Sequence, residues 1–377
     1  MPVVFLLVFC LLAFLVLLLL IAGYLWLAYQ RGRWPFDEGS NPRYPAREFF
    51  ARNQVVLSGS KAQVDSALSV ARGVRLTRVE RLDFSELPLP EGCPVPDDFV
   101  VDLYRIEGWL PRVQQAVRAL KRTPAGQAGE VEAEPNWVTG HPWEPEGSPW
   151  EPEGSPWEPE GSPWEPEGSA PSGAPRRRPS IVEAQPEWFA TQWAWQSIGL
   201  ENRLKSVDGT GIAVGIFDTS PYAFPPDTRG YHQDVPFVTW PAPMQCTVSH
   251  PRFAAPPAPA SHPLPDVRNH GLFIAGLIHA VAPGADLHLV RVLNSHNRGD
   301  LFTLLREVFL FLKAHAGGQG MVLNLSLGIR VPPPEAGFDL PAEVKALHYL
   351  TVAARCLGSV VVAAAGNESS PQAALPG

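Results

Sequence analysis

Three side chains in the C-terminal half of this sequence, Asp218, His270 and Asn367, have the types and the order that acyl-transfer chemistry requires. Asp218 ends an apolar run, and His270 opens an apolar helix. Ser326 and Asn367 lie at the ends of two later apolar runs. A carboxylate that orients an imidazole, the imidazole as general base and an amide that donates to an oxyanion form such a site. Each residue alone also fits a helix cap or a turn, so their order along the chain is what favours catalysis.

His270 precedes a predicted helix over Leu272–Val281, with Asn269 as a good N-cap and a Pro-Gly stop after the last turn. The positive end of the helix dipole favours the neutral imidazole, which is the form that a general base needs near pH 7. A lone histidine in this place more often only caps a helix. Its assignment as a base therefore depends on the partners that the rest of the chain supplies.

The elements that must position these residues alternate between strand and helix, which is typical of a doubly wound parallel sheet in the α/β class. Long apolar runs predict strands buried on both faces, and residues at their carboxyl ends gather at one edge. The predicted strands are Gly211–Asp218, Asp286–Leu293, Met321–Gly328 and Ser359–Ala365. The predicted helices after the first are Asp300–Lys313 and Pro341–Leu357. No element is predicted in the Pro- and Ala-rich loop from Tyr222 to Asp266.

A smaller α+β unit is predicted before this domain, with the ferredoxin-like element order βαββαβ. Between the two units, PWEPEGS occurs four times, starting at Pro142. Two prolines and two glutamates per repeat favour an extended, solvated spacer, and binding of its tryptophans to a sugar or a proline-recognising module is the alternative. The predicted domains are a transmembrane anchor at 2–30, the α+β unit at 50–139, the linker at 140–185 and the α/β domain at 190–377.

The N-terminus predicts a transmembrane helix, because no charged residue occurs from Pro2 to Gln30 and about 20 apolar residues suffice to span a bilayer. A cleaved signal peptide is the alternative, but its apolar region is only about 7–15 residues long after a basic start. We therefore expect a single-pass protein of the cell membrane, with the lipid bilayer as a partner. Arg31 and Arg33 follow the span and place the bulk of the chain in the cytoplasm.

Composition excludes some classes of function. The net charge is −8, and the four repeats carry two glutamates each, so the remainder is close to neutral. Without a basic surface, nucleic acid is not an expected partner. The four cysteines have no metal-ligand spacing, and one disulfide is allowed without being required. Cys356 is expected to be a small buried apolar residue.

Five motifs occur in the order found in one family of hydrolases. They are QWAWQSIGL, GIAVGIFDTS, HGLFIAGLIHAVAPGA, VLNLSLG and VVVAAAGNE. From about Gln192 to Gly377 the chain resembles the catalytic domain of the subtilisin-like serine proteases, or subtilases. The preceding βαββαβ unit, which ends in VEAEPNWV, resembles their inhibitory propeptide.

The resemblance implies a serine endopeptidase that hydrolyses polypeptide substrates and is inhibited by its own propeptide. Asp218 would orient His270, His270 would be the general base, and the Asn367 amide would stabilise the oxyanion. The substrate backbone would pair with three consecutive residues, namely Ser326, Leu327 and Gly328. No cofactor and no metal site are expected; calcium is common in the family, but no ligand cluster identifies a site. The family implies an extracytoplasmic protease domain, whereas the charge bias around the N-terminal span implies a cytoplasmic one; we expect the extracytoplasmic location.

The nucleophile of the family lies in a Gly-Thr-Ser motif, and this motif does not occur in the chain. We expect the serine beyond residue 377 and the chain as written to be inactive. The alternative is a truncated, non-catalytic relative that acts as a binding or interaction protein. A nucleotide-binding domain is not favoured, because no Gly-rich phosphate motif follows the first strand. The chain also differs from the motifs of the family close to the predicted acid and base, at Ser220, Leu272 and Phe273.

Overall fold

The computed structural model describes eleven stretches of the chain. They are residues 14–24, 49–71, 73–108, 113–140, 197–199, 207–220, 244–249, 270–293, 298–318, 320–329 and 344–364. Most of the linker, Asn269 and Asn367 lie outside these stretches, so the structure does not test what was predicted for them. The domain boundaries also remain predictions.

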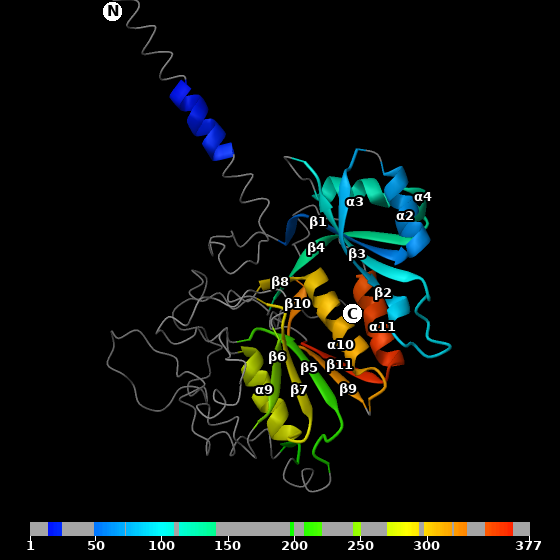
Figure 1. The fold of residues 1–377 in the computed structure, drawn as a ribbon, viewed down its shortest axis with the longest axis vertical. Helices are drawn as coiled ribbons and strands as arrows, with labels where there is room; N and C mark the ends of the chain where they lie inside the picture. Colours follow the sequence, from blue (N-terminus) through cyan, green and yellow to red (C-terminus); the bar gives the residue numbers. More distant parts are fainter. Residues whose placement is uncertain are drawn as a thin grey trace, which may run out of the picture.

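The first unit is an antiparallel sheet with helices on one face (Figure 1). Its elements are β1 (Phe50–Ser60), α2 (Lys61–Val70), β2 (Leu76–Asp83), η1 (Phe84–Glu86), β3 (Phe99–Ile106), α3 (Val113–Lys121), α4 (Pro124–Gln127) and β4 (Val131–Gly140). The strands lie in the order β4-β1-β3-β2. Alternate side chains of these strands point to opposite faces, so one set packs on α2 and α3 and the other set forms a second core.

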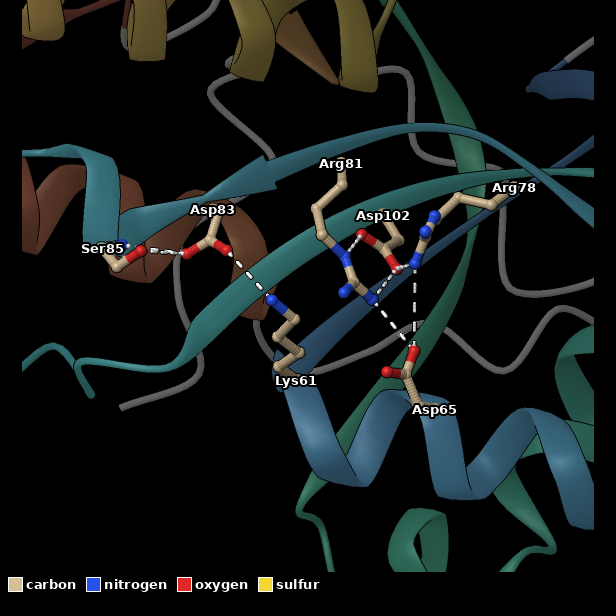
Figure 2. Close-up of polar contacts among 7 residues, drawn as sticks. All are labelled: Lys61, Asp65, Arg78, Arg81, Asp83, Ser85 and Asp102. Carbon is tan, nitrogen blue, oxygen red and sulfur yellow. Dashed lines mark hydrogen bonds and ion pairs between the residues drawn. The ribbon is translucent and has the colours of Figure 1, made fainter.

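A buried carboxylate fixes the edge of this sheet to its centre. Arg81 of β2 donates from Nε and Nη2 to the two oxygens of Asp102 in β3, each over 2.7 Å, and Asp102 is fully buried. The Tyr104 hydroxyl donates to the same carboxylate over 2.8 Å. Figure 2 shows that Arg78 and the α2 residue Asp65 face this pair. The hydrogen bond with Asp102 raises the pKa of Arg81, so the guanidinium keeps its positive charge.

The second unit is a parallel sheet. Its elements are β5 (Ala213–Asp218), β6 (Cys246–Ser249), α9 (His270–Val281), β7 (Asp286–Arg291), α10 (Leu301–His315), β9 (Met321–Leu325), α11 (Lys345–Cys356) and β11 (Ser359–Ala363). Its strands lie in the order β11-β9-β5-β7-β6, and all pairs are parallel. Helix α9 packs on one face, while α10 and α11 cover the other. Strand β6 lies inside the Pro-rich loop, where no element was expected.

Helices α10 and α11 lie between the two sheets, so one core belongs to both units (Figure 1). Phe84 of η1 lies 5.5 Å from Phe309 of α10, and Phe99 of β3 lies 4.4 Å from Tyr349 of α11, measured between ring centroids. Full burial of each of the three phenylalanine rings contributes about 1.5–3 kcal/mol to folding. The first unit is therefore docked through apolar contact on the helices that also support β5.

Polar contacts and a covalent bond surround this shared core. Arg306 of α10 donates from Nε to Glu80 of β2 over 2.6 Å. A disulfide joins Cys93, which lies between β2 and β3, to Cys356 at the end of α11. The expectation that Cys356 is only a buried apolar side chain is therefore wrong.

The predicted fold class is wrong because it includes a transmembrane helix. Within the described stretches, no helix combines the length and the apolar character needed to cross a membrane. The prediction of a single-pass location in the cell membrane is wrong for the same reason. The observed fold is a mixed α/β arrangement of one antiparallel and one parallel sheet.

Candidate active site

Asp218 is the last residue of β5, the central strand of the parallel sheet, and its side chain is fully buried. The backbone N–H of Thr219 donates to its Oδ1 over 2.6 Å, and the Thr219 hydroxyl donates to the same oxygen over 3.1 Å. The N–H of Val292, just after β7, donates to the backbone carbonyl of Asp218 over 3.0 Å. These bonds hold the carboxylate at the carboxyl end of the sheet.

His270 is the first residue of α9, and its Nδ1 lies 3.0 Å from both carboxylate oxygens of Asp218. With Nδ1–H donating to the carboxylate, Nε2 is left as the proton acceptor. Burial lowers the pKa of His270, but the hydrogen bond and the negative charge of Asp218 outweigh it and raise the pKa above its ordinary value. The His270 side chain remains 37% exposed, so solvent and a reacting group have access to the imidazole.

Gly271 explains how α9 comes so close to the end of β5. A Cβ atom at this position would lie 2.1 Å from the Thr219 carbonyl oxygen and 2.9 Å from the Asp218 Cβ. The Gly271 N–H also donates to the Thr219 hydroxyl over 3.3 Å. Sequence reasoning did not assign roles to Thr219 and Gly271. The sequence features that could have indicated these roles are a hydroxyl residue directly after Asp218 and a glycine directly after His270.

The three predicted substrate-binding residues follow β9 and have different environments. Ser326 donates its hydroxyl to the Asn324 side chain over 2.8 Å. Leu327 is buried in the core shared by the two units. Gly328 begins the short strand β10 (Gly328–Ile329) and is the only one of the three in a strand pair.

The partner of Gly328 is the end of β4, which belongs to the first unit. Gly140 lies opposite Gly328, and Thr139 lies opposite Ile329. On its other side β4 pairs with β8 (Arg298–Asp300), so residues 138–140 lie between two short strands of the second unit. Sequence reasoning missed β8 and this pairing, because segments of two or three residues carry no periodic signal.

A buried polar link fixes β4 in this register. Asn136 donates from its amide to Asp300 over 2.7 Å and to Gln54 over 2.7 Å, and its carbonyl oxygen accepts the N–H of Phe302 over 2.9 Å. Asp300 is also the N-cap of α10 and accepts the Thr303 N–H over 3.1 Å. The same carboxylate thus starts α10 and holds β4 of the other unit.

The structure therefore brings Asp218 and His270 into contact and puts Gly328 into a strand pair, while Asn367 lies outside the described residues. Among the described residues, one group of three side chains with metal-binding donors occurs, and it does not include Asp218 or His270. A buried carboxylate and a partly exposed imidazole can accept a proton at Nε2 and stabilise the resulting cation.

Comparison with protein-family models gives no match to this chain, and comparison with curated proteins gives none either.

Proposed function

We propose that this chain carries the acid, the base and the substrate-pairing edge of a serine endopeptidase that cleaves polypeptides. The single observation that carries the proposal is the contact of the buried Asp218 carboxylate with Nδ1 of His270, 3.0 Å from each oxygen. The order of the surrounding motifs, with their resemblance to subtilases, supports the same reaction.

In the proposed reaction, Nε2 of His270 takes the proton of a serine hydroxyl and later gives it to the leaving amine. Asp218 keeps the imidazole in the tautomer with Nδ1–H and stabilises the imidazolium that forms in between. The Asn367 amide would donate to the oxyanion, and removal of such a donor costs about 10²–10³-fold in turnover. Because only neutral His270 accepts a proton, activity should rise with pH through its raised pKa.

We also propose that the first unit inhibits this site within the same chain. Substrates in this reaction would add as a strand beside Gly328. In the structure, Gly140 and Thr139 of β4 already pair with this edge. A substrate strand and the end of β4 therefore compete for the same backbone groups.

The test is to read the gene past the codon for Gly377 and to express the resulting chain. A Gly-Thr-Ser segment, labelling of its serine by a fluorophosphonate and hydrolysis of a peptide substrate would support the proposal. His270→Ala is expected to abolish hydrolysis, while the control His348→Ala, at an exposed position of α11, is expected to retain it. A stop codon at this position, or hydrolysis that survives His270→Ala, would refute the proposal. The stop codon would favour a non-catalytic binding protein instead.

A further inference from the structure

A second cluster of chemically active side chains lies at the other end of the parallel sheet. It consists of Asp286 and His288 on β7 and His315 at the end of α10. In the register of β7 with β5, Asp286 lies beside Ala213, whereas Asp218 lies beside Arg291. At about 3.3 Å per residue, these two ends are about 16 Å apart along the strand. The cluster is therefore separate from the candidate active site.

The backbone brings the three side chains together. Asp286 and His288 are two residues apart on one strand, so their side chains point to the same face of the sheet. His315 reaches this face from the last residue of α10. One donor atom from each of the three residues lies within 4.8 Å of the other two, and His288 Nε2 lies 2.8 Å from an Asp286 oxygen.

A buried aromatic ring supports both imidazoles. Phe311 lies one turn before His315 on α10, and its ring centroid is 4.3 Å from that of His315 and 5.6 Å from that of His288. Phe311 is 6% exposed and packs edge-on against Phe217 of β5. The imidazoles are thus supported from the core. In contrast, the Asp286 side chain is 65% exposed, which leaves the cluster accessible to ions from solvent.

We propose that Asp286, His288 and His315 form a binding site for a zinc ion. Two imidazole nitrogens and one carboxylate oxygen are a ligand set that zinc uses, with water in the fourth position of the tetrahedron. Calcium and magnesium prefer oxygen ligands, so this set selects against them. The ion replaces the hydrogen bond between Asp286 and His288, and it ties the C-terminal end of α10 to the start of β7.

The experiment uses the full 377-residue chain, stripped of metal with a chelator and titrated with ZnCl2 by calorimetry. We expect one saturable site and a rise in the thermal unfolding midpoint, because zinc binds the folded state. The imidazole NMR signals of His288 and His315 should shift on addition of zinc. Millimolar MgCl2 or CaCl2 should neither reproduce nor block these effects.

Three single variants and one double variant make the assignment specific. Loss of an outer-shell partner already weakens metal binding about 10–100-fold, so we expect His288→Ala and His315→Ala each to weaken zinc binding about 100-fold or more. The control variant His348→Ala also lacks one histidine, but outside the cluster, and should bind zinc as the wild type does. Circular dichroism of the metal-free variants shows whether they are folded. The proposal is overturned if the wild type binds no zinc, or if a folded His288→Ala/His315→Ala double variant binds zinc with unchanged affinity.

Discussion

Replacement of Glu134 by glutamine should make the stability of this protein much less sensitive to pH. Glu134 lies on β4 and is 1% exposed. Its Oε2 accepts a hydrogen bond from the Trp137 indole over 3.0 Å, whereas its Oε1 is buried with no hydrogen-bond partner among the described residues. It pairs in register with Val56, a member of the core that the two units share. A charge at this position would be poorly solvated.

The size of the pH-dependent change in unfolding free energy follows from the pKa of the Glu134 side chain. Burial raises the pKa of Glu134 from 4.5 to about 8, while the hydrogen bond from Trp137 opposes the rise. The folded protein thus holds a proton that the unfolded chain releases. Its contribution to stability is full below pH 4.5 and is lost as the pH rises to about 8. At about 1.4 kcal/mol for each pKa unit, the loss amounts to about 5 kcal/mol.

The assay is urea unfolding of the full chain at several values between pH 5 and pH 9, for the wild type and for Glu134→Gln. The glutamine has the shape of the protonated acid and does not titrate. The difference in unfolding free energy between the two proteins cancels the titration of every other group. We expect this difference to move in favour of the variant by about 4 kcal/mol between pH 5 and pH 9, because part of the total loss has already occurred at pH 5.

Glu132→Gln is the matched control, because Glu132 lies two residues earlier on β4 and is partly exposed beside Lys121. Glu132→Gln should keep most of the pH dependence of the wild type, slightly reduced because the negative charge of Glu132 helps to raise the pKa of Glu134. The reasoning is refuted if the difference between wild type and Glu134→Gln is the same at pH 5 and pH 9. A carbon-13 NMR titration of Glu134 with a midpoint near 4.5 would refute it as well.

Three further predictions concern the candidate site and its attachment to the first unit. Asp218→Asn should lower the pKa of His270 below 6.5 in a proton NMR titration, because burial then acts without the opposing carboxylate; an unchanged pKa would contradict this. Gly271→Ala places a Cβ 2.1 Å from a backbone oxygen and should cost about 1–3 kcal/mol in urea unfolding, so wild-type stability would contradict the packing argument. Asn136→Ala removes the buried bond to Asp300 and should also cost about 1–3 kcal/mol, with faster amide exchange in β4 and β8; unchanged exchange there would be the opposite result.

Local patterns were sufficient for the elements that bury apolar residues over a long run. Strand β5 falls within the predicted Gly211–Asp218, and α9 adds His270 and Gly271 to the predicted helix over Leu272–Val281. The sequence also indicated that Asp218 and His270 share an edge of the sheet. The distance between the Asp218 carboxylate and the His270 imidazole could not be predicted from the sequence, because it depends on the space left by the glycine at position 271.

The errors arise where the structure depends on partners far away in the chain. Strands β6, β8 and β10 are two to four residues long and exist through their pairing with β7 and β4. The partners of a disulfide cannot be deduced from cysteine positions, and Cys93 and Cys356 are 263 residues apart. For the N-terminus, hydropathy alone predicted a transmembrane helix, and no helix among the described residues is long and apolar enough to be one.

Because Cys93 and Cys356 are joined by a disulfide, cleavage of the chain between the two units would not by itself release the first unit. Proteolysis between Gly140 and Ala213 would divide the chain into two polypeptides, and each of them would carry one of these cysteines. The two pieces would still migrate as one species in gel filtration under denaturing, non-reducing conditions. Only a thiol reductant would let the first unit diffuse away from the edge that contains Gly328. Departure of that unit therefore depends on the redox state of the surroundings as well as on the state of the backbone.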